Sequence, residues 1–120
     1  KVITAIDLPT GAVHNIALPT FGTYQYPGGM ALYKGQLYIT DQQNGLAVLN
    51  LATEQVEKLI TFDEKLHLLW YLALDGHSLY TTTYSNDLSM NVVFQVDLDT
   101  GAIKSFPLET PAIGIAVLSP

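Results

Sequence analysis

The chain has 120 residues, of which 48% are apolar and 13% are charged, and its formal net charge is −6. Because the chain is rich in apolar residues and poor in charge, it is not intrinsically disordered. No run reaches the roughly 18 to 20 apolar residues of a membrane-spanning helix. The five basic residues are too few to grip a phosphate backbone, so we do not expect nucleic acid as a partner.

Strand-like segments follow one another along the whole chain. Residues 1–18 are predicted to form the last two strands of one unit. Complete units of four strands are expected over 27–62, at 29–33, 36–41, 45–51 and 55–62, and over 71–108, at 71–74, 78–83, 92–98 and 102–106. Residues 110–120 are predicted to begin a further unit, with its first strand at 110–118. β-Branched and aromatic residues, which strands prefer, are frequent in these segments.

Internal repeats support this division. The segment 30–40 resembles 72–82 at an offset of 42 residues, which aligns Tyr38 with Tyr80. A second motif, apolar-Asp-Leu-x-Thr-Gly in its fullest form, occurs at 6–11, 49–54 and 96–101, with spacings of 43 and 47 residues. A third, a Pro/Gly-led apolar run, occurs at 27–32 and again at 111–118. Repetition at this period is typical of architectures built from one supersecondary unit.

Turn residues separate the predicted strands. Asn44-Gly45 and Asp75-Gly76 accept positive φ easily, which suits tight hairpins. The aspartates of the second motif, Asp7, Asp97 and Asp99, are interpreted as turn formers. The charges between residues 53 and 66 also allow a helix there, but the repeat register favours a strand followed by a loop after Thr61.

Four short strands repeating every 42 to 47 residues indicate an all-β protein made of β-propeller blades, each a four-stranded antiparallel sheet. The series Pro-x-Gly-ϕ-Ala-ϕ, Gly-x-Leu-Tyr-ϕ-Thr-Asp and ϕ-Asp-Leu-x-Thr-Gly, with ϕ apolar, resembles the NHL, YWTD and gluconolactonase-like group of propellers. Residues 37–41 match the YWTD core with Ile39 in the place of Trp, whereas residues 79–83 lack the acid. The resemblance covers nearly the whole chain and specifies fold better than activity.

Counting strands gives two plus eight plus one, or eleven, which is under three blades, whereas propellers close with about four to eight. An incomplete ring would expose more apolar surface than soluble monomers tolerate. We therefore expect further blades from a second chain, from the rest of a longer chain or from self-association. Because both ends fall in or beside apolar strand-like runs, we favour a fragment or processed chain over a self-assembling oligomer.

Candidate binding residues lie in the loops that propellers place at the mouth of the channel, since loops on a rigid scaffold commonly carry function. These loops are 19–27, 41–44, 61–70, 84–91 and 108–111. The ligand-binding candidates within them are Tyr24, Tyr26, Asp41, Gln42, Asn44, His67, Trp70, Tyr84, Asn86 and Asp87.

The aromatic candidates have competing structural interpretations. Tyr24 and Tyr26 could stack a sugar or an apolar ligand, but packing between blades with wet hydroxyls is favoured. His67 could act as a general base because imidazole titrates near neutrality, although an isolated loop histidine is more often polar surface. Trp70 could anchor a ligand or a partner, and packing between blades is again the favoured interpretation.

Three of the polar candidates, Asp41, Asn86 and Asp87, carry the oxygen donors that Ca²⁺ and other hard cations accept. The resemblance to gluconolactonase-like propellers implies a divalent ion held by Glu, Asn and Asp, yet none of their positions can be carried over, so no metal ligand is assigned. Asp41 is interpreted as structural and Asp87 as solvated. The sequence has no histidine cluster with zinc spacing, no phosphate-binding glycine loop and no Gly-x-Ser-x-Gly elbow.

Two functions remain open. The first is a scaffold that binds a ligand or a protein without catalysis, because no acid, base and nucleophile converge in the sequence. The second is part of a propeller enzyme, a lactonase-type hydrolase or lyase with or without a divalent metal, whose catalytic residues would come from several blades. Fold alone cannot choose between them. The absence of cysteine leaves the compartment open, with a slight preference for a secreted or extracytoplasmic one.

Overall fold

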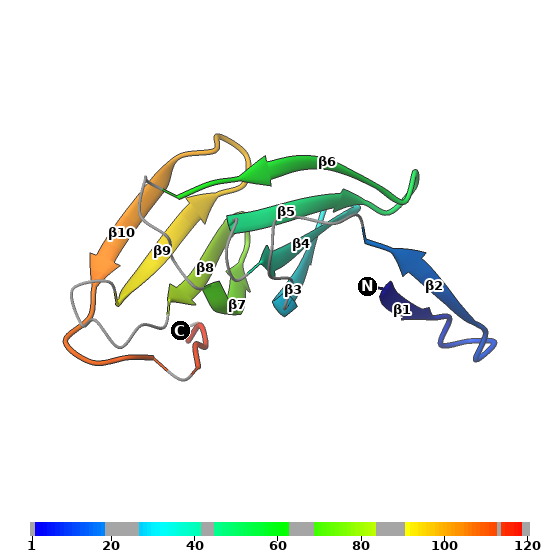
Figure 1. The fold of residues 1–120 in the computed structure, drawn as a ribbon, viewed down its shortest axis with the longest axis horizontal. Helices are drawn as coiled ribbons and strands as arrows, with labels where there is room; N and C mark the ends of the chain where they lie inside the picture. Colours follow the sequence, from blue (N-terminus) through cyan, green and yellow to red (C-terminus); the bar gives the residue numbers. More distant parts are fainter. Residues whose placement is uncertain are drawn as a thin grey trace.

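The computed structural model describes residues 2–18, 27–41, 45–62, 69–83, 91–112 and 114–118, with the backbone alone at residues 27 and 41. All the regular secondary structure within these ranges is β-strand (Figure 1), which confirms the predicted all-β class. The strands are β1 (Val2–Ile6), β2 (Val13–Ala17), β3 (Pro27–Tyr33), β4 (Gln36–Asp41), β5 (Gly45–Asn50), β6 (Gln55–Ile60), β7 (Leu69–Asp75), β8 (Ser78–Thr83), β9 (Val92–Asp97) and β10 (Ile103–Pro107). In these ranges there is no helix long and apolar enough to cross a membrane.

The strands form three antiparallel sheets in which neighbours in the chain are also neighbours in the sheet. The first sheet is the hairpin β1–β2, the second is β3–β4–β5–β6 and the third is β7–β8–β9–β10. Each of the two complete sequence repeats therefore folds as one four-stranded sheet. β6 shows that the strand interpretation is correct for residues 55–60, where a helix was the alternative.

β3 and β7 begin two residues earlier than predicted because the same β-bulge lies near the start of each. In β3 the bulge falls between Pro27 and Met30, and in β7, 42 residues later, between Leu69 and Leu72. Pairing with the neighbouring strand resumes on the far side of each bulge, so the strand extends past the point where the alternation of side chains is interrupted. Trp70, predicted to lie in a loop, is consequently part of β7.

A threonine hydroxyl holds each bulge. The Gly29 amide donates to Thr40 Oγ1 over 2.7 Å, and at the matching position the Tyr71 amide donates to Thr82 Oγ1 over 3.4 Å. The Thr40 hydroxyl also lies 3.2 Å from the Trp70 carbonyl oxygen and donates to it, which joins the second sheet to the third. Thr40 therefore fixes both the shape of β3 and its contact with β7.

The strand predicted at 110–118 is not found: residues 110–112 and 114–118 form no regular element. A β-strand is defined by hydrogen bonds to a neighbouring strand, and none of the described strands pairs with this segment. These residues therefore form no eleventh strand within the described part of the chain, and their place in a further blade stays a prediction.

The two middle strands of the second sheet, β4 and β5, are covered on both faces. One core cluster joins this sheet to the third sheet through Tyr38, Val48, Leu79 and Phe94 among others, and a smaller cluster joins it to the first sheet through Ile16 and three residues of β4 and β5. Five consecutive residues of β5, 45–49, are consequently buried, whereas a strand with one open face alternates. β10, at the outer edge of the third sheet, is exposed along its whole length.

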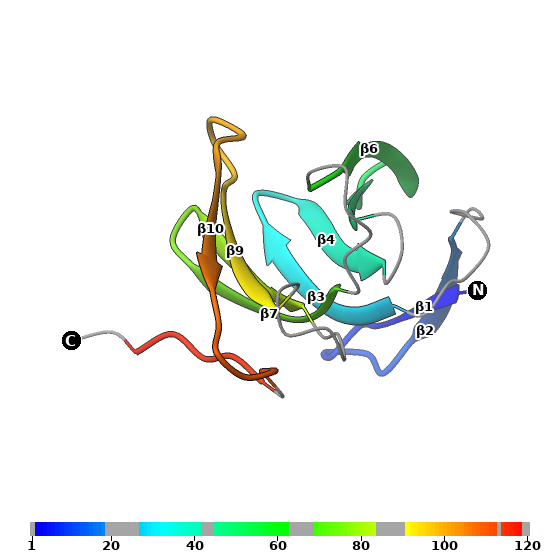
Figure 2. The same cartoon turned by 60° about the vertical axis from the view of Figure 1, so that its left-hand side comes forward.

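The second and third sheets approach most closely at their first strands, β3 and β7, which lie against each other (Figure 2). Gly28 permits this contact, because a Cβ atom there would be 2.5 Å from the Trp70 carbonyl oxygen. A Cβ at Gly29 would be 3.1 Å from the same oxygen. The Gly28-Gly29 pair is thus needed for a backbone-to-backbone contact between sheets.

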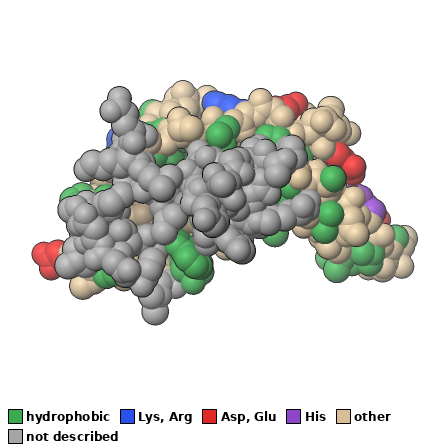
Figure 3. Space-filling view, viewed as in Figure 1, with side chains coloured by type: hydrophobic (Ala, Val, Ile, Leu, Met, Phe, Trp, Pro, Cys, Tyr) green, Lys and Arg blue, Asp and Glu red, His purple; other side chains and the backbone are tan. Residues whose placement is uncertain are grey.

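Apolar side chains are exposed where the outer sheets lack a neighbour. On the first sheet these include Val2, Ile6 and Val13, each more than half exposed, and Figure 3 shows apolar side chains gathered at that end of the molecule. On the third sheet, Phe106 is 47% exposed. Solvent-exposed apolar patches of this kind are typical of surfaces that contact further protein.

Candidate functional site

Most of the loop residues predicted to bind a ligand lie outside the described residues. This applies to Tyr24, Tyr26, Gln42, Asn44, His67, Tyr84, Asn86 and Asp87, and for Asp41 only the backbone is described, at the end of β4. Trp70 is described: its ring lies 6.2 Å from that of Tyr71 at 35°. Its backbone carbonyl accepts from the Thr40 hydroxyl of the second sheet, and packing of its side chain between blades stays a prediction. The binding roles of the other loop residues stay predictions.

A cleft of about 440 Å³ opens between the second and third sheets, at the ends of the sheets that carry the β3–β4 and β9–β10 turns. We call it the inter-sheet cleft. Its walls combine apolar side chains with carboxylate, amide, ammonium and hydroxyl groups. They are formed by Gln36, Tyr38, Val48, Glu57, Lys58 and Ile60 of the second sheet and by Val96, Asp97, Leu98, Asp99, Thr100 and Gly101 of the third.

On the second sheet, a chain of hydrogen bonds leads to Glu57. The Tyr38 hydroxyl donates to Gln36 Oε1 over 3.1 Å, and Gln36 Nε2 donates to Glu57 Oε2 over 3.3 Å. Asn50 Nδ2 donates to the other oxygen, Glu57 Oε1, over 2.8 Å. Both carboxylate oxygens are thus held by neutral amides. Burial is the main reason that the pKa of Tyr38 is raised, so its hydroxyl keeps its proton and remains a donor.

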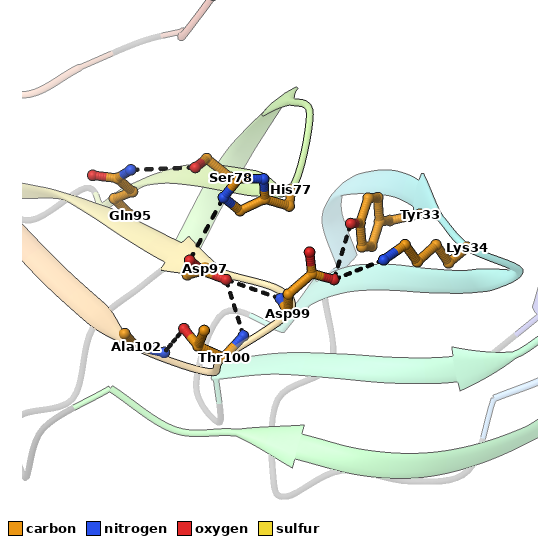
Figure 4. A network of polar contacts seen from close by, with 9 residues as sticks. All are labelled: Tyr33, Lys34, His77, Ser78, Gln95, Asp97, Asp99, Thr100 and Ala102. Carbon is orange, nitrogen blue, oxygen red and sulfur yellow. Dashed lines mark hydrogen bonds and ion pairs between the residues drawn. The ribbon is translucent and has the colours of Figure 1, made fainter.

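On the third sheet, the β9–β10 turn is organised by Asp97 (Figure 4). Asp97 Oδ1 accepts from the amides of Asp99 and Thr100, each over 2.9 Å. The Thr100 amide is the main cause, and the Asp99 amide a further one, of a lowered Asp97 pKa. The His77 ring lies 3.6 Å from Asp97 Oδ2. The carboxylate is therefore held as an anion chiefly by neutral backbone donors.

The turn-forming role predicted for Asp7 and Asp97 is confirmed. Asp7 Oδ1 accepts from the Thr10 amide over 3.0 Å, in the same geometry as at Asp97. Asn50 has this position in the second sheet, where its Oδ1 accepts from the amides of Ala52 and Thr53. A short polar side chain at this point satisfies the turn's own amides.

Asp99 has a different role from the one predicted. Its Oδ1 accepts from Lys34 Nζ over 2.9 Å and from the Tyr33 hydroxyl over 3.0 Å, and both donors belong to the β3–β4 region of the second sheet (Figure 4). The lysine contact is the main reason that the pKa of Asp99 is lowered, and the same contact raises the pKa of Lys34. Asp99 thus bridges two sheets at the cleft mouth.

The lining of the cleft holds three carboxylates and one ammonium group, that of Lys58, so its negative charge is only partly neutralised. Of its three carboxylates, Asp99 pairs with Lys34, whereas Glu57 and Asp97 have no Lys or Arg partner among the described residues. Its hydroxyl groups are not activated for nucleophilic attack: Tyr38 donates to an amide oxygen, and the Thr100 Oγ1 accepts from the Ala102 amide. The arrangement is suited to holding a cation and offers no nucleophile–base pair.

Sequence reasoning located the Asp97 turn but missed the cleft. Its two walls are separated by more than 30 residues in the chain, and no repeat or motif places Glu57 opposite residues 97–101. In the described part of the chain, no group of three or more His, Asp or Glu side chains could hold a metal ion. A scan of protein-family models finds none that matches the chain, and a search of curated proteins also finds no match.

Proposed function

We propose that this chain is part of a β-propeller in which each sheet is one blade, and that it acts as a non-catalytic scaffold that binds a basic segment of a partner protein. The observation that carries the proposal is the inter-sheet cleft, where Glu57 and Asp97 line one space from opposite sheets and neither pairs with a Lys or Arg of the described residues, although Lys58 is also part of the lining. A Lys or Arg side chain would supply the missing positive charge.

Three features support the propeller. The two complete sheets are four-stranded meanders related by a repeat in sequence. The middle strand β5 of the second sheet is buried on both faces, and the first strands β3 and β7 lie against each other. Repetition of this face-to-face packing is the arrangement from which a ring of blades is built.

Charge favours a basic partner over an acidic one. The chain has a net charge of −6, so a positively charged segment is attracted before contact and an acidic one is repelled. The apolar wall residues Val48, Ile60 and Leu98 can cover the aliphatic part of a long basic side chain. We therefore expect binding that weakens steeply as salt concentration rises.

The test uses a fluorescein-labelled Gly-Arg-Gly-Arg-Gly peptide and its glutamate counterpart, measured by fluorescence anisotropy. We expect the arginine peptide to bind and Glu57→Gln to weaken that binding about five- to tenfold, since one cleft charge is lost. The matched control is Glu109→Gln, which removes an exposed carboxylate outside the cleft. Equal binding by the wild type and Glu57→Gln, or equal binding of both peptides, would contradict the proposal.

Thermal unfolding with and without Ca²⁺ distinguishes the scaffold from a metal-dependent propeller enzyme. A divalent-metal enzyme gains stability when its ion is added, by mass action. A Tm that rises with millimolar Ca²⁺ would favour the metal-dependent enzyme, and a Tm that does not change would favour the scaffold.

A further inference from the structure

We propose that the first sheet is completed by a β-hairpin from polypeptide outside these 120 residues. The inner strand of this hairpin would cover Met30 and Leu32, and its second strand would pair with the free edge of β1. The inference rests on the proposed propeller, and it specifies the structural element that completes the first sheet. The occupant we infer is an antiparallel hairpin of the β3–β4 kind, with alternating apolar residues.

The first argument for the missing hairpin is the position of β1 in its sheet. Asp7, Asn50 and Asp97 hold the same kind of turn, so β1 corresponds to β5 and β9, the strands before those turns. β5 and β9 each have a partner on both edges, whereas β1 pairs only with β2. The other edge of β1 therefore presents backbone N–H and C=O groups that no described strand satisfies.

The second argument comes from two exposed side chains on β3. Met30 and Leu32 are 55% and 57% exposed, although they pair with Ile39 and Leu37, which pack toward the first sheet. Their equivalents 42 residues later, Leu72 and Leu74, are half-buried in the core between the second and third sheets, where β3 lies against β7. Met30 and Leu32 thus lack the strand that covers their equivalents.

The third argument is the sequence of β1 itself. Solvent-exposed edge strands usually carry Lys, Pro or other charged residues, which prevent pairing with further strands. β10 is such an edge and contains Lys104 and Pro107. β1 has no charge and no proline between Val2 and Ile6. Its sequence is that of an interior strand.

The test adds a copy of residues 27–43 directly before Lys1, because the spacing of the repeats places residue 1 at the position of residue 44. In the added copy Leu replaces Met, as at Leu72, so that Met30 and Met90 remain the two methionines of the extended chain. The control chain carries the same addition with proline at the copied positions of Ala31 and Tyr38, which cannot form the hairpin.

Two measurements report on the edge of β1 and on the exposed face of β3. They are hydrogen exchange at the amides of Val2–Ile6 and oxidation of Met30 by peroxide, and both are followed by peptide mapping. We expect both to slow about tenfold or more in the extended chain relative to the control. Equal rates in the two chains would overturn the inference. Protection of β1 that rises with concentration in the unmodified chain would also overturn it, because a second copy would then be the occupant. If only this inference fails, the arginine peptide still binds and Glu57→Gln still weakens its binding.

Discussion

Single polar side chains set the geometry of the hairpin turns in this protein. Asp7, Asn50 and Asp97 each accept backbone amides of the turn that follows them, so one device recurs in all three sheets. The use of Asn at one of the three positions shows that the turn requires an oxygen acceptor and not a charge. The turn therefore does not need the negative charge that Asp97 places on the wall of the cleft.

The first prediction concerns that charge. Asp97→Asn is expected to keep the turn, as Asn50 does, but to change the dependence of stability on pH. The pKa of Asp97 is lowered in the folded state, so its contribution is complete above the unfolded value of about 3.9 and is lost as pH falls through the folded value.

Urea denaturation from about pH 2 to pH 7 measures this effect. The unfolding free energy of the wild type should fall more steeply below about pH 4 than that of Asp97→Asn. Glu109→Gln controls for the loss of one carboxylate in general. Parallel curves for the wild type and Asp97→Asn would show that Asp97 does not act as described.

The second prediction concerns Thr40, whose hydroxyl is fully buried. Thr40→Val keeps the shape of the side chain but removes the acceptor for the Gly29 amide and the donor to Trp70, at a cost of about 1–3 kcal/mol. Thr82→Val is the matched control, because the bond that Thr82 accepts from the Tyr71 amide is longer, at 3.4 Å. Chemical denaturation should show the larger loss for Thr40→Val, and the reverse order would refute the joining role of Thr40.

At the scale of strands and sheets, the repeat made most elements predictable. The 42-residue offset and the turn motifs located β4 and β8 with their observed ends, and strand-like composition between turn residues located the other strands of the two complete units to within about two residues. The bulges could not be predicted, since they depend on the bond from Thr40 to an amide 11 residues away. The cleft could not be predicted either, because its walls meet only when two sheets pack together.

The third prediction tests how closely two of those sheets pack. Gly28→Ala places a Cβ atom 2.5 Å from the Trp70 carbonyl oxygen and 3.0 Å from its Cα, so β3 and β7 must separate. We expect a loss of about 1–3 kcal/mol, as for overpacking in a core. Gly114→Ala meets nothing within 4 Å and should change stability by less than about 0.5 kcal/mol. Similar unfolding midpoints for the two variants would mean that the sheets can shift without cost.

At the scale of the whole molecule, burial is greatest in the second sheet and decreases toward both ends. Adjacent sheets share apolar cores, and a polar contact at a turn also joins each pair: His14 with Glu54, and Lys34 with Asp99. The outer faces of the first and third sheets have no such partners among the described residues. The same composition that builds the inner cores therefore leaves apolar side chains exposed at the two ends.

The fourth prediction follows from this gradient of burial. Hydrogen exchange in the dilute chain should be slowest in β5, which is buried over 45–49 and paired on both edges, and fastest in β1 and β10. Protection should differ about a hundredfold or more between β5 and β10, because an exposed edge strand opens without disturbing the core. If β10 exchanges as slowly as β5 at every concentration, the third sheet is not open as described. If its exchange slows only as concentration rises, another molecule covers that sheet, as the proposed propeller requires.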